Sequence, residues 1–170
     1  MGYTHYWNFK NDVAPKDIEG GKVKFFKAVF MAAKCLKKVE AMGIKVCGGN
    51  GEGLPVFKDG YISFNGCREK GENHETFSIN TEDGAYNFCK TNEKPYNLLV
   101  CLALLAFKWA FGKDFTYKSD GITKEAYENR ESNAYWKQIG FVPEGPSKDW
   151  VTAYEVWEQV KKEMGIVLTL

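Results

Sequence analysis

The stretch NLLVCLALLAFKWAF, residues 97–111, constrains the fold more than any other part of this 170-residue chain. Pro95 precedes it and Gly112 follows it, and these residue types are common at the start and the end of a helix. Because it is apolar on nearly every side, we expect it to be a central helix that other elements bury. Its longest apolar run, from Leu98 to Phe107, stops at Lys108 and is too short to span a bilayer.

The remaining elements are expected to surround this helix. Residues 3–9 alternate as a strand does, and Asp59-Gly60 suits a type I′ turn between two hairpin strands within 56–66. Periodicity and turn residues place the other strands at 44–47, 76–79, 115–119 and 166–170, and helices at 21–42, 123–138 and 148–164. This order predicts an α+β fold with a mainly antiparallel sheet, the buried central helix, and further helices packed on it.

The helix over 21–42 is expected to end at Gly43, a residue that readily adopts the left-handed conformation. Spacing at three and four residues predicts its buried stripe, formed by Phe26, Val29, Phe30, Ala33, Leu36 and Val39.

Bulk properties exclude several classes of protein. We find no linker or repeat, so residues 1–170 are expected to form a single globular domain. A net charge of +1 argues against general nucleic-acid binding. The five cysteines form no C-x-x-C pair and the two histidines lack metal-ligand spacing, so no metal site is expected. No cofactor is expected either. The odd number of widely spaced cysteines does not suggest a set of disulfides, so a reducing cytoplasm is the simplest setting. The sequence leaves the oligomeric state open, and a homo-oligomer is allowed.

The chain begins MGYTHYWNF, which concentrates ring surface around one of the two histidines. Alternating aromatics on a strand commonly fill a core. Rings can also stack on a flat ligand, and both roles stay open for His5, Tyr6 and Trp7.

Two loops contain further candidate residues. The loop GGNGEG (48–53) can bring backbone N–H groups close to a phosphate or a sugar around Asn50, although a mobile hairpin connection explains it almost as well. The motif NHETF (73–77) places His74 beside Glu75, the residue types that general acid–base catalysis needs. A solvated loop end is the alternative for this pair.

Two more polar motifs lie at the ends of predicted elements. In FCKTNEKPYN (88–97), Lys90 and Thr91 precede the central helix, whose N-terminus attracts anions; ordinary helix capping is the alternative. In KSDG (118–121), Asp120 follows a strand and is most simply a turn residue, although the sheet order could bring it to the same site.

Taken together, MGYTHYW, GNGEG, ISFNG, HETF, FCKTNEKPYN and SDG resemble a family of small uncharacterised bacteriophage proteins, over residues 1–121. Members of that family tend to have an aspartate where this chain has Asn97. The resemblance implies a setting in the host cytoplasm, where small phage proteins often counter host defence, but it implies no activity. Residues 122–170, the C-terminal helices and short strand, lie outside the resemblance.

We therefore expect a phage protein that binds a small nucleotide-derived ligand in a preformed pocket and counters host defence signalling, without a membrane association. The residues expected to line the pocket are His5, Tyr6, Trp7, Asn50, Asn65, Glu75, Lys90, Thr91, Tyr96 and Asp120. One alternative is a hydrolase or transferase that acts on such a ligand, with His5, His74 and Glu75 as its catalytic groups. Another is a protein that inhibits a host enzyme through a flat surface.

Overall fold

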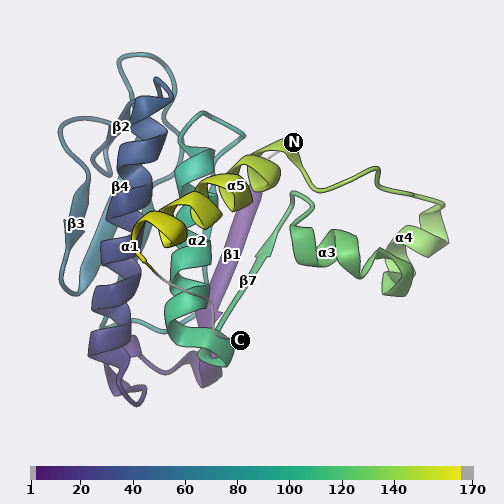
Figure 1. Cartoon of the computed structure of the whole chain (residues 1–170), viewed down its shortest axis with the longest axis horizontal. Helices are drawn as coiled ribbons and strands as arrows, with labels where there is room; N and C mark the ends of the chain where they lie inside the picture. Colours follow the sequence, from purple (N-terminus) through teal and green to yellow (C-terminus); the bar gives the residue numbers. More distant parts are fainter. Residues whose placement is uncertain (1–2, 166–170) are drawn as a thin grey trace.

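The computed structural model describes residues 3–165 and places the apolar helix at the centre, as predicted. This helix, α2 (Asn97–Phe111), packs along α1 (Gly21–Ala41), and α5 (Lys148–Glu163) crosses both (Figure 1). Eleven consecutive residues of α2, from Asn97 to Phe107, are buried. Gly112 ends the helix with a positive φ of 57°, a conformation that glycine adopts without steric cost.

Two antiparallel sheets flank α2, which confirms the α+β class (Figure 1). The three-stranded sheet has the order β6 (Asn87–Lys90), β1 (Thr4–Phe9), β7 (Phe115–Ser119). The four-stranded sheet contains β2 (Val46–Cys47), β3 (Val56–Lys58), β4 (Tyr61–Gly66) and β5 (Phe77–Asn80), with β4 paired to the other three.

Aromatic side chains join the two sheets to the central helix. The rings of Trp7 in β1 and Phe77 in β5 lie 4.9 Å apart, so the sheets meet at this point. Phe9 packs edge-on against Phe107 and Phe111 of α2, with centroid distances of 6.3 and 4.9 Å. Edge-to-face pairs of this kind stabilise a core beyond the area that they bury.

The buried stripe of α1 differs from the predicted one. Helix bounds and the positive φ of Gly43, 84°, agree with the sequence. However, Phe25 is buried where Phe26 was expected, and Phe26 and Phe30 are 53% and 43% exposed. Helical periodicity alone does not show which of two adjacent phenylalanines is buried, since either one completes an apolar stripe. Packing against α2 selects Phe25, whose ring lies 5.1 Å from Phe107.

Two further predictions are wrong in detail, and one strand was not predicted. The helix expected over 123–138 is divided into α3 (Lys124–Glu128) and α4 (Ala134–Ile139), because Asn133 accepts a hydrogen bond from the Trp136 amide and starts a new helix. The hairpin turn has a positive φ at Gly60 but not at Asp59, so it is not type I′. Strand β6 was not predicted, because three of its four residues belong to a motif before α2 that resembles a helix cap.

Two further expectations concern the C-terminal strand and the absence of a membrane-spanning helix. The strand expected at 166–170 lies outside the described residues. Between residues 3 and 165, none of the helices combines the length and the apolar character needed to cross a bilayer.

Candidate functional site

The three-stranded sheet has one face buried against α2 and one face that carries exposed side chains. In β1, His5, Trp7 and Phe9 point inward, so Thr4, Tyr6 and Asn8 belong to the opposite face. We call this second surface the open face; its residues are Thr4, Tyr6, Asn8, Tyr86, Phe88, Lys90, Thr116, Lys118 and Asp120.

Antiparallel register aligns the side chains of the open face in rows. Tyr6 lies opposite Phe88 of β6 on one side and opposite Lys118 of β7 on the other. Residues directly opposite each other in antiparallel strands lie on the same face, about 5 Å apart. The central row is therefore Phe88, Tyr6, Lys118, which combines two rings with one ammonium group.

Tyr86 extends this row into an aromatic surface. Its ring stacks on Tyr6 with a centroid distance of 5.9 Å and an interplanar angle of 18°. Tyr86 and Phe88 are 58% and 59% exposed, so both rings are open to solvent. Partial burial raises the pKa of Tyr86 above its ordinary value. We call Tyr6, Tyr86 and Phe88 the platform.

Polar residues close one end of the open face. Lys90 lies opposite Thr4, whose backbone exchanges two hydrogen bonds with Asp120: the Thr4 amide donates to Asp120 Oδ2 (3.0 Å), and the Asp120 amide donates to the Thr4 carbonyl (2.9 Å). Asp120 and Lys90 are both exposed. Lys90 and Asp120 therefore flank Thr4 on its two sides, and the Asp120 carboxylate is held by the Thr4 amide.

The motif NHETF lies along the outer edge of β6, next to Lys90. Glu75 Oε2 accepts a hydrogen bond from the Lys90 amide (2.6 Å), and the Glu75 amide donates to the Lys90 carbonyl (3.2 Å). His74 Nδ1 lies 2.7 Å from that same carbonyl. Because a carbonyl oxygen only accepts, His74 carries its proton on Nδ1, and Nε2 is the acceptor nitrogen of this exposed ring.

His5 lies directly behind the open face, in a buried polar network centred on Asn97. Asn97 Oδ1 accepts hydrogen bonds from His5 Nε2 and Thr91 Oγ1, both at 2.6 Å, and Asn97 Nδ2 donates to Asp149 Oδ2 at 2.6 Å. His5, Thr91 and Asn97 are fully buried. The network joins β1, the start of α2 and the start of α5.

Burial determines the protonation of His5. Donation from Nε2 leaves Nδ1 without its proton, and within residues 3–165 Nδ1 has no hydrogen-bond partner. Removal from water lowers the pKa of His5 to about 4, although the contact with Asn97 acts in the opposite direction. His5 is therefore neutral at pH 7 and has no access to a ligand on the surface.

The sequence-predicted residues thus separate into distinct groups. Tyr6, Glu75, Lys90 and Asp120, with His74, gather on or beside the open face. His5 and Thr91 belong to the buried network, where sequence reasoning missed Asn97 as the hub and Asp149 as its partner. Asp149 is 52 positions from Asn97 and follows a Pro/Gly loop, so no local signal links the two.

Trp7 and Tyr96, two further candidates, lie in the core. Trp7 is 2% exposed, and Tyr96, with no exposed surface, donates its hydroxyl proton to the Glu75 carbonyl at 2.6 Å. Burial raises the pKa of Tyr96. These two side chains fix the layer beneath the site and do not line it.

Asn50 and Asn65 hold the glycine loop in place. The Asn65 amide donates to the carbonyls of Gly49 (3.1 Å) and His74 (2.9 Å), and its oxygen accepts from the amides of Gly66 and His74. Asn50 Oδ1 accepts from the Glu52 amide and closes a turn. The Asn65 bonds tie the glycine loop and the loop before β5 to strand β4, so both asparagines act here as structural residues.

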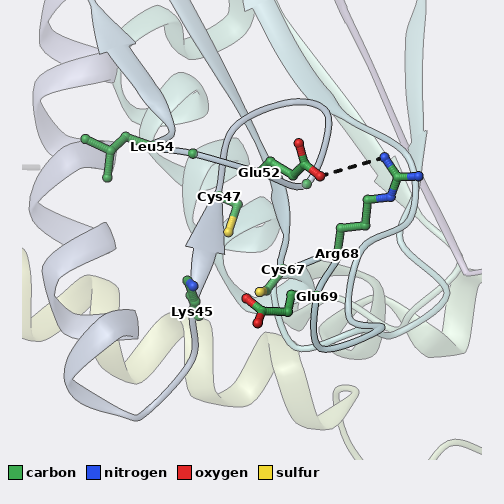
Figure 2. A pocket seen from close by; sticks show the side chains of 9 residues that line it. Lys45, Cys47, Glu52, Leu54, Cys67, Arg68 and Glu69 are labelled. Carbon is green, nitrogen blue, oxygen red and sulfur yellow. Dashed lines mark ion pairs between the residues drawn. The ribbon is translucent and has the colours of Figure 1, made fainter.

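The glycine loop borders an open cleft of about 870 Å³ near the start of β2 (Figure 2). Cys47 and Cys67 line it, and burial raises the pKa of the Cys47 thiol, with a hydrogen bond to Cys67 as the next cause. Lys45 and Arg68 are balanced by Glu52 and Glu69, and the Arg68–Glu52 pair is 3.9 Å apart and exposed. Balanced charge gives this cleft no preference for an anion.

Neither a metal site nor a known relative indicates what the open face binds. Within residues 3–165, no group of three or more His, Cys, Asp or Glu side chains is arranged to hold a metal ion. Comparison of the chain with protein-family models, curated proteins and solved structures gives no match. The class of this protein is therefore set by its fold and open face: an α+β protein with an exposed aromatic and basic sheet surface.

Proposed function

We propose that this chain binds a small nucleotide-derived ligand on the open face, with its base on the platform and its phosphate near Lys90 or Lys118. The central row of Phe88, Tyr6 and Lys118 carries the proposal. Sheet surfaces with exposed rings stack nucleobases in several unrelated nucleic-acid-binding folds, because every base has a π-face.

The polar rim suits the remainder of such a ligand. Lysine ammonium groups pair with phosphate, and Asp120 offers a carboxylate that accepts hydrogen bonds from ribose hydroxyls or base amines. The proposed site is a surface flanked by polar groups, which differs from the preformed pocket expected from the sequence. We further propose that binding counters a nucleotide signal of host defence in the cytoplasm of an infected cell.

Binding is tested by calorimetric titration with a panel of nucleotides, with Phe88→Ala as the main variant. Loss of one stacked ring is expected to weaken binding by roughly 5- to 150-fold, since base–aromatic stacking contributes about 1–3 kcal/mol. Phe26→Ala on α1 is the matched control, because Phe26 is 53% exposed against 59% for Phe88. Equal affinities of wild type and Phe88→Ala would contradict the proposal.

A hydrolase or transferase is the second candidate, and the orientation of His74 favours it. Its Nδ1 proton is held by the Lys90 carbonyl, so Nε2 presents a lone pair at the edge of the open face. Mass analysis of the recovered ligand distinguishes the candidates. An enzyme changes the ligand mass and loses that activity in His74→Gln, whereas a binding protein returns the ligand intact.

A further inference from the structure

A second cleft adjoins the open face along the outer edge of β7. Its volume is about 730 Å³, and it lies between β7 and the pair α3–α4. Lys118 and Asp120 form one wall, and Glu125, Asn129 and Trp136 form part of the other. The cleft therefore shares two residues with the open face and continues it sideways.

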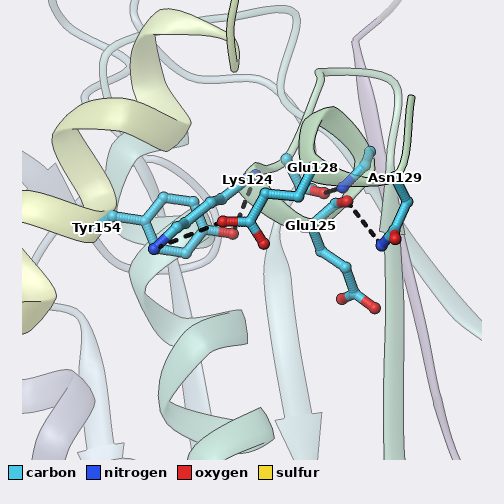
Figure 3. Close-up of polar contacts among 7 residues, drawn as sticks. Lys124, Glu125, Glu128, Asn129 and Tyr154 are labelled. Atoms are coloured by element: carbon cyan, nitrogen blue, oxygen red, sulfur yellow. Dashed lines mark hydrogen bonds and ion pairs between the residues drawn. The ribbon is translucent and has the colours of Figure 1, made fainter. Parts of the chain in front are cut away.

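The far wall of this cleft is held in place by helix caps and by α5. Thr123 Oγ1 accepts from the Ala126 amide at 3.0 Å at the start of α3. Tyr154 of α5 accepts a hydrogen bond from the Lys124 amide at 3.2 Å, and Asn129 Nδ2 donates to the Glu125 carbonyl at 3.0 Å (Figure 3). The Tyr154 contact fixes the start of α3 against α5, and the other two hydrogen bonds hold the conformation of α3 itself.

Side chains in the cleft have the chemistry that a nucleoside requires. Trp136 and Tyr135 supply rings, and Tyr135 is 66% exposed. The Trp136 indole packs against Phe141 with a centroid distance of 5.6 Å, so one side of it is supported. Asn129 presents an amide and Glu125 a carboxylate, groups that pair with base edges and ribose hydroxyls.

Lys118 lies at the boundary of the two surfaces. It is directly opposite Tyr6, one strand away, and two strands from Phe88, which corresponds to about 5 and 10 Å. A nucleotide stacked on the platform would therefore direct its phosphate toward Lys118 and its next unit into the cleft.

We infer that the ligand is a dinucleotide: one base lies on the platform, the linking phosphate lies at Lys118, and the second nucleoside occupies the α3–α4 cleft. This inference rests on the proposed function, because it extends the same site. It also assigns a role to residues 122–147, which carry none of the motifs found in the first 121 residues.

Calorimetric titration of the full chain compares the four nucleoside monophosphates with the four linear homodinucleotides. For the preferred base, the dinucleotide is expected to bind roughly 5- to 150-fold more tightly than the monophosphate, which is the range for one additional stacked base. Trp136→Ala is expected to remove that advantage and to leave monophosphate affinity unchanged. Phe88→Ala weakens both ligands. Tyr135→Ala provides the same test if Trp136→Ala fails to fold.

Three outcomes would overturn the inference. Equal affinity for the monophosphate and the dinucleotide would refute it and leave the proposed function intact. Affinity that continues to rise with tetra- and hexanucleotides would instead indicate single-stranded nucleic acid as the ligand. Absence of binding by every ligand in the panel would remove the proposed function and the inference together.

Discussion

Lowering the pH from 7 to 4 is expected to destabilise the protein through His5. His5 is buried and donates from Nε2 to Asn97, and its Nδ1 has no partner among the described residues. Its pKa in the folded state is about 4, against the ordinary value of 6.5. Below pH 6.5 the unfolded chain therefore binds a proton at His5 that the folded chain does not, so stability decreases as the pH falls.

The size of the effect follows from the two pKa values. They differ by about 2.5, and since each pH unit corresponds to 1.36 kcal/mol, the loss reaches about 3 kcal/mol. The free energy of unfolding attributed to His5 is complete above pH 6.5, declines between pH 6.5 and about 4, and falls no further below that. This loss is a large fraction of the stability of a typical domain.

Urea unfolding at pH 7, 5.5 and 4 measures this effect in the wild type and in His5→Gln. The glutamine amide can donate to Asn97 but does not titrate, so this variant should lose about 3 kcal/mol less than the wild type over the same pH range. NMR titration of His5 gives its pKa directly and needs no variant. A pKa of His5 near 6.5, or equal losses in the two proteins, would refute the reasoning.

Three further predictions concern the network around Asn97, the two faces of the three-stranded sheet, and Gly66 of β4. Asn97→Asp is expected to destabilise the protein by roughly 2–4 kcal/mol at pH 7, because it places a carboxylate beside Asp149; Asn97→Asp combined with Asp149→Asn should recover most of this loss in urea unfolding. Phe88→Ala should change the free energy of unfolding by less than about 0.5 kcal/mol, whereas Trp7→Ala should lower it by about 3–5 kcal/mol. Similar losses of stability in the two variants would contradict the assignment of the two faces of the sheet. Gly66→Ala should prevent native folding, as judged by circular dichroism, since its Cβ would lie 1.9 Å from the Glu72 carbonyl oxygen; a cooperative native-like transition would contradict this.

The sequence predicted the central helix, the N-terminal strand and the α+β class because each depends on local periodicity. Alternation in Thr4–Phe9 and the apolar character of Asn97–Phe111 depend only on neighbouring residues. The stripe of α1 could not be predicted correctly, because Phe25 and Phe26 are equivalent until α2 is in place.

Only part of the candidate site could be predicted from the sequence. Tyr6, Lys90 and Asp120 were singled out as residues next to turns or rings, and register brings them to one face. Phe88 and Tyr86 were missed, because β6 was not predicted and the face to which their side chains point could not be assigned. The link between Asn97 and Asp149 depends on the packing of α5 across α2, which no local pattern indicates.

Chemical-shift mapping by NMR with adenosine monophosphate and the other three monophosphates tests the central claim most directly. Binding on the open face predicts the largest shifts at Tyr6, Tyr86, Phe88 and Lys118, with saturation at increasing ligand concentration. Shifts centred instead on the glycine loop and Cys47, or absent for all four monophosphates, would contradict the account of the open face as the ligand site.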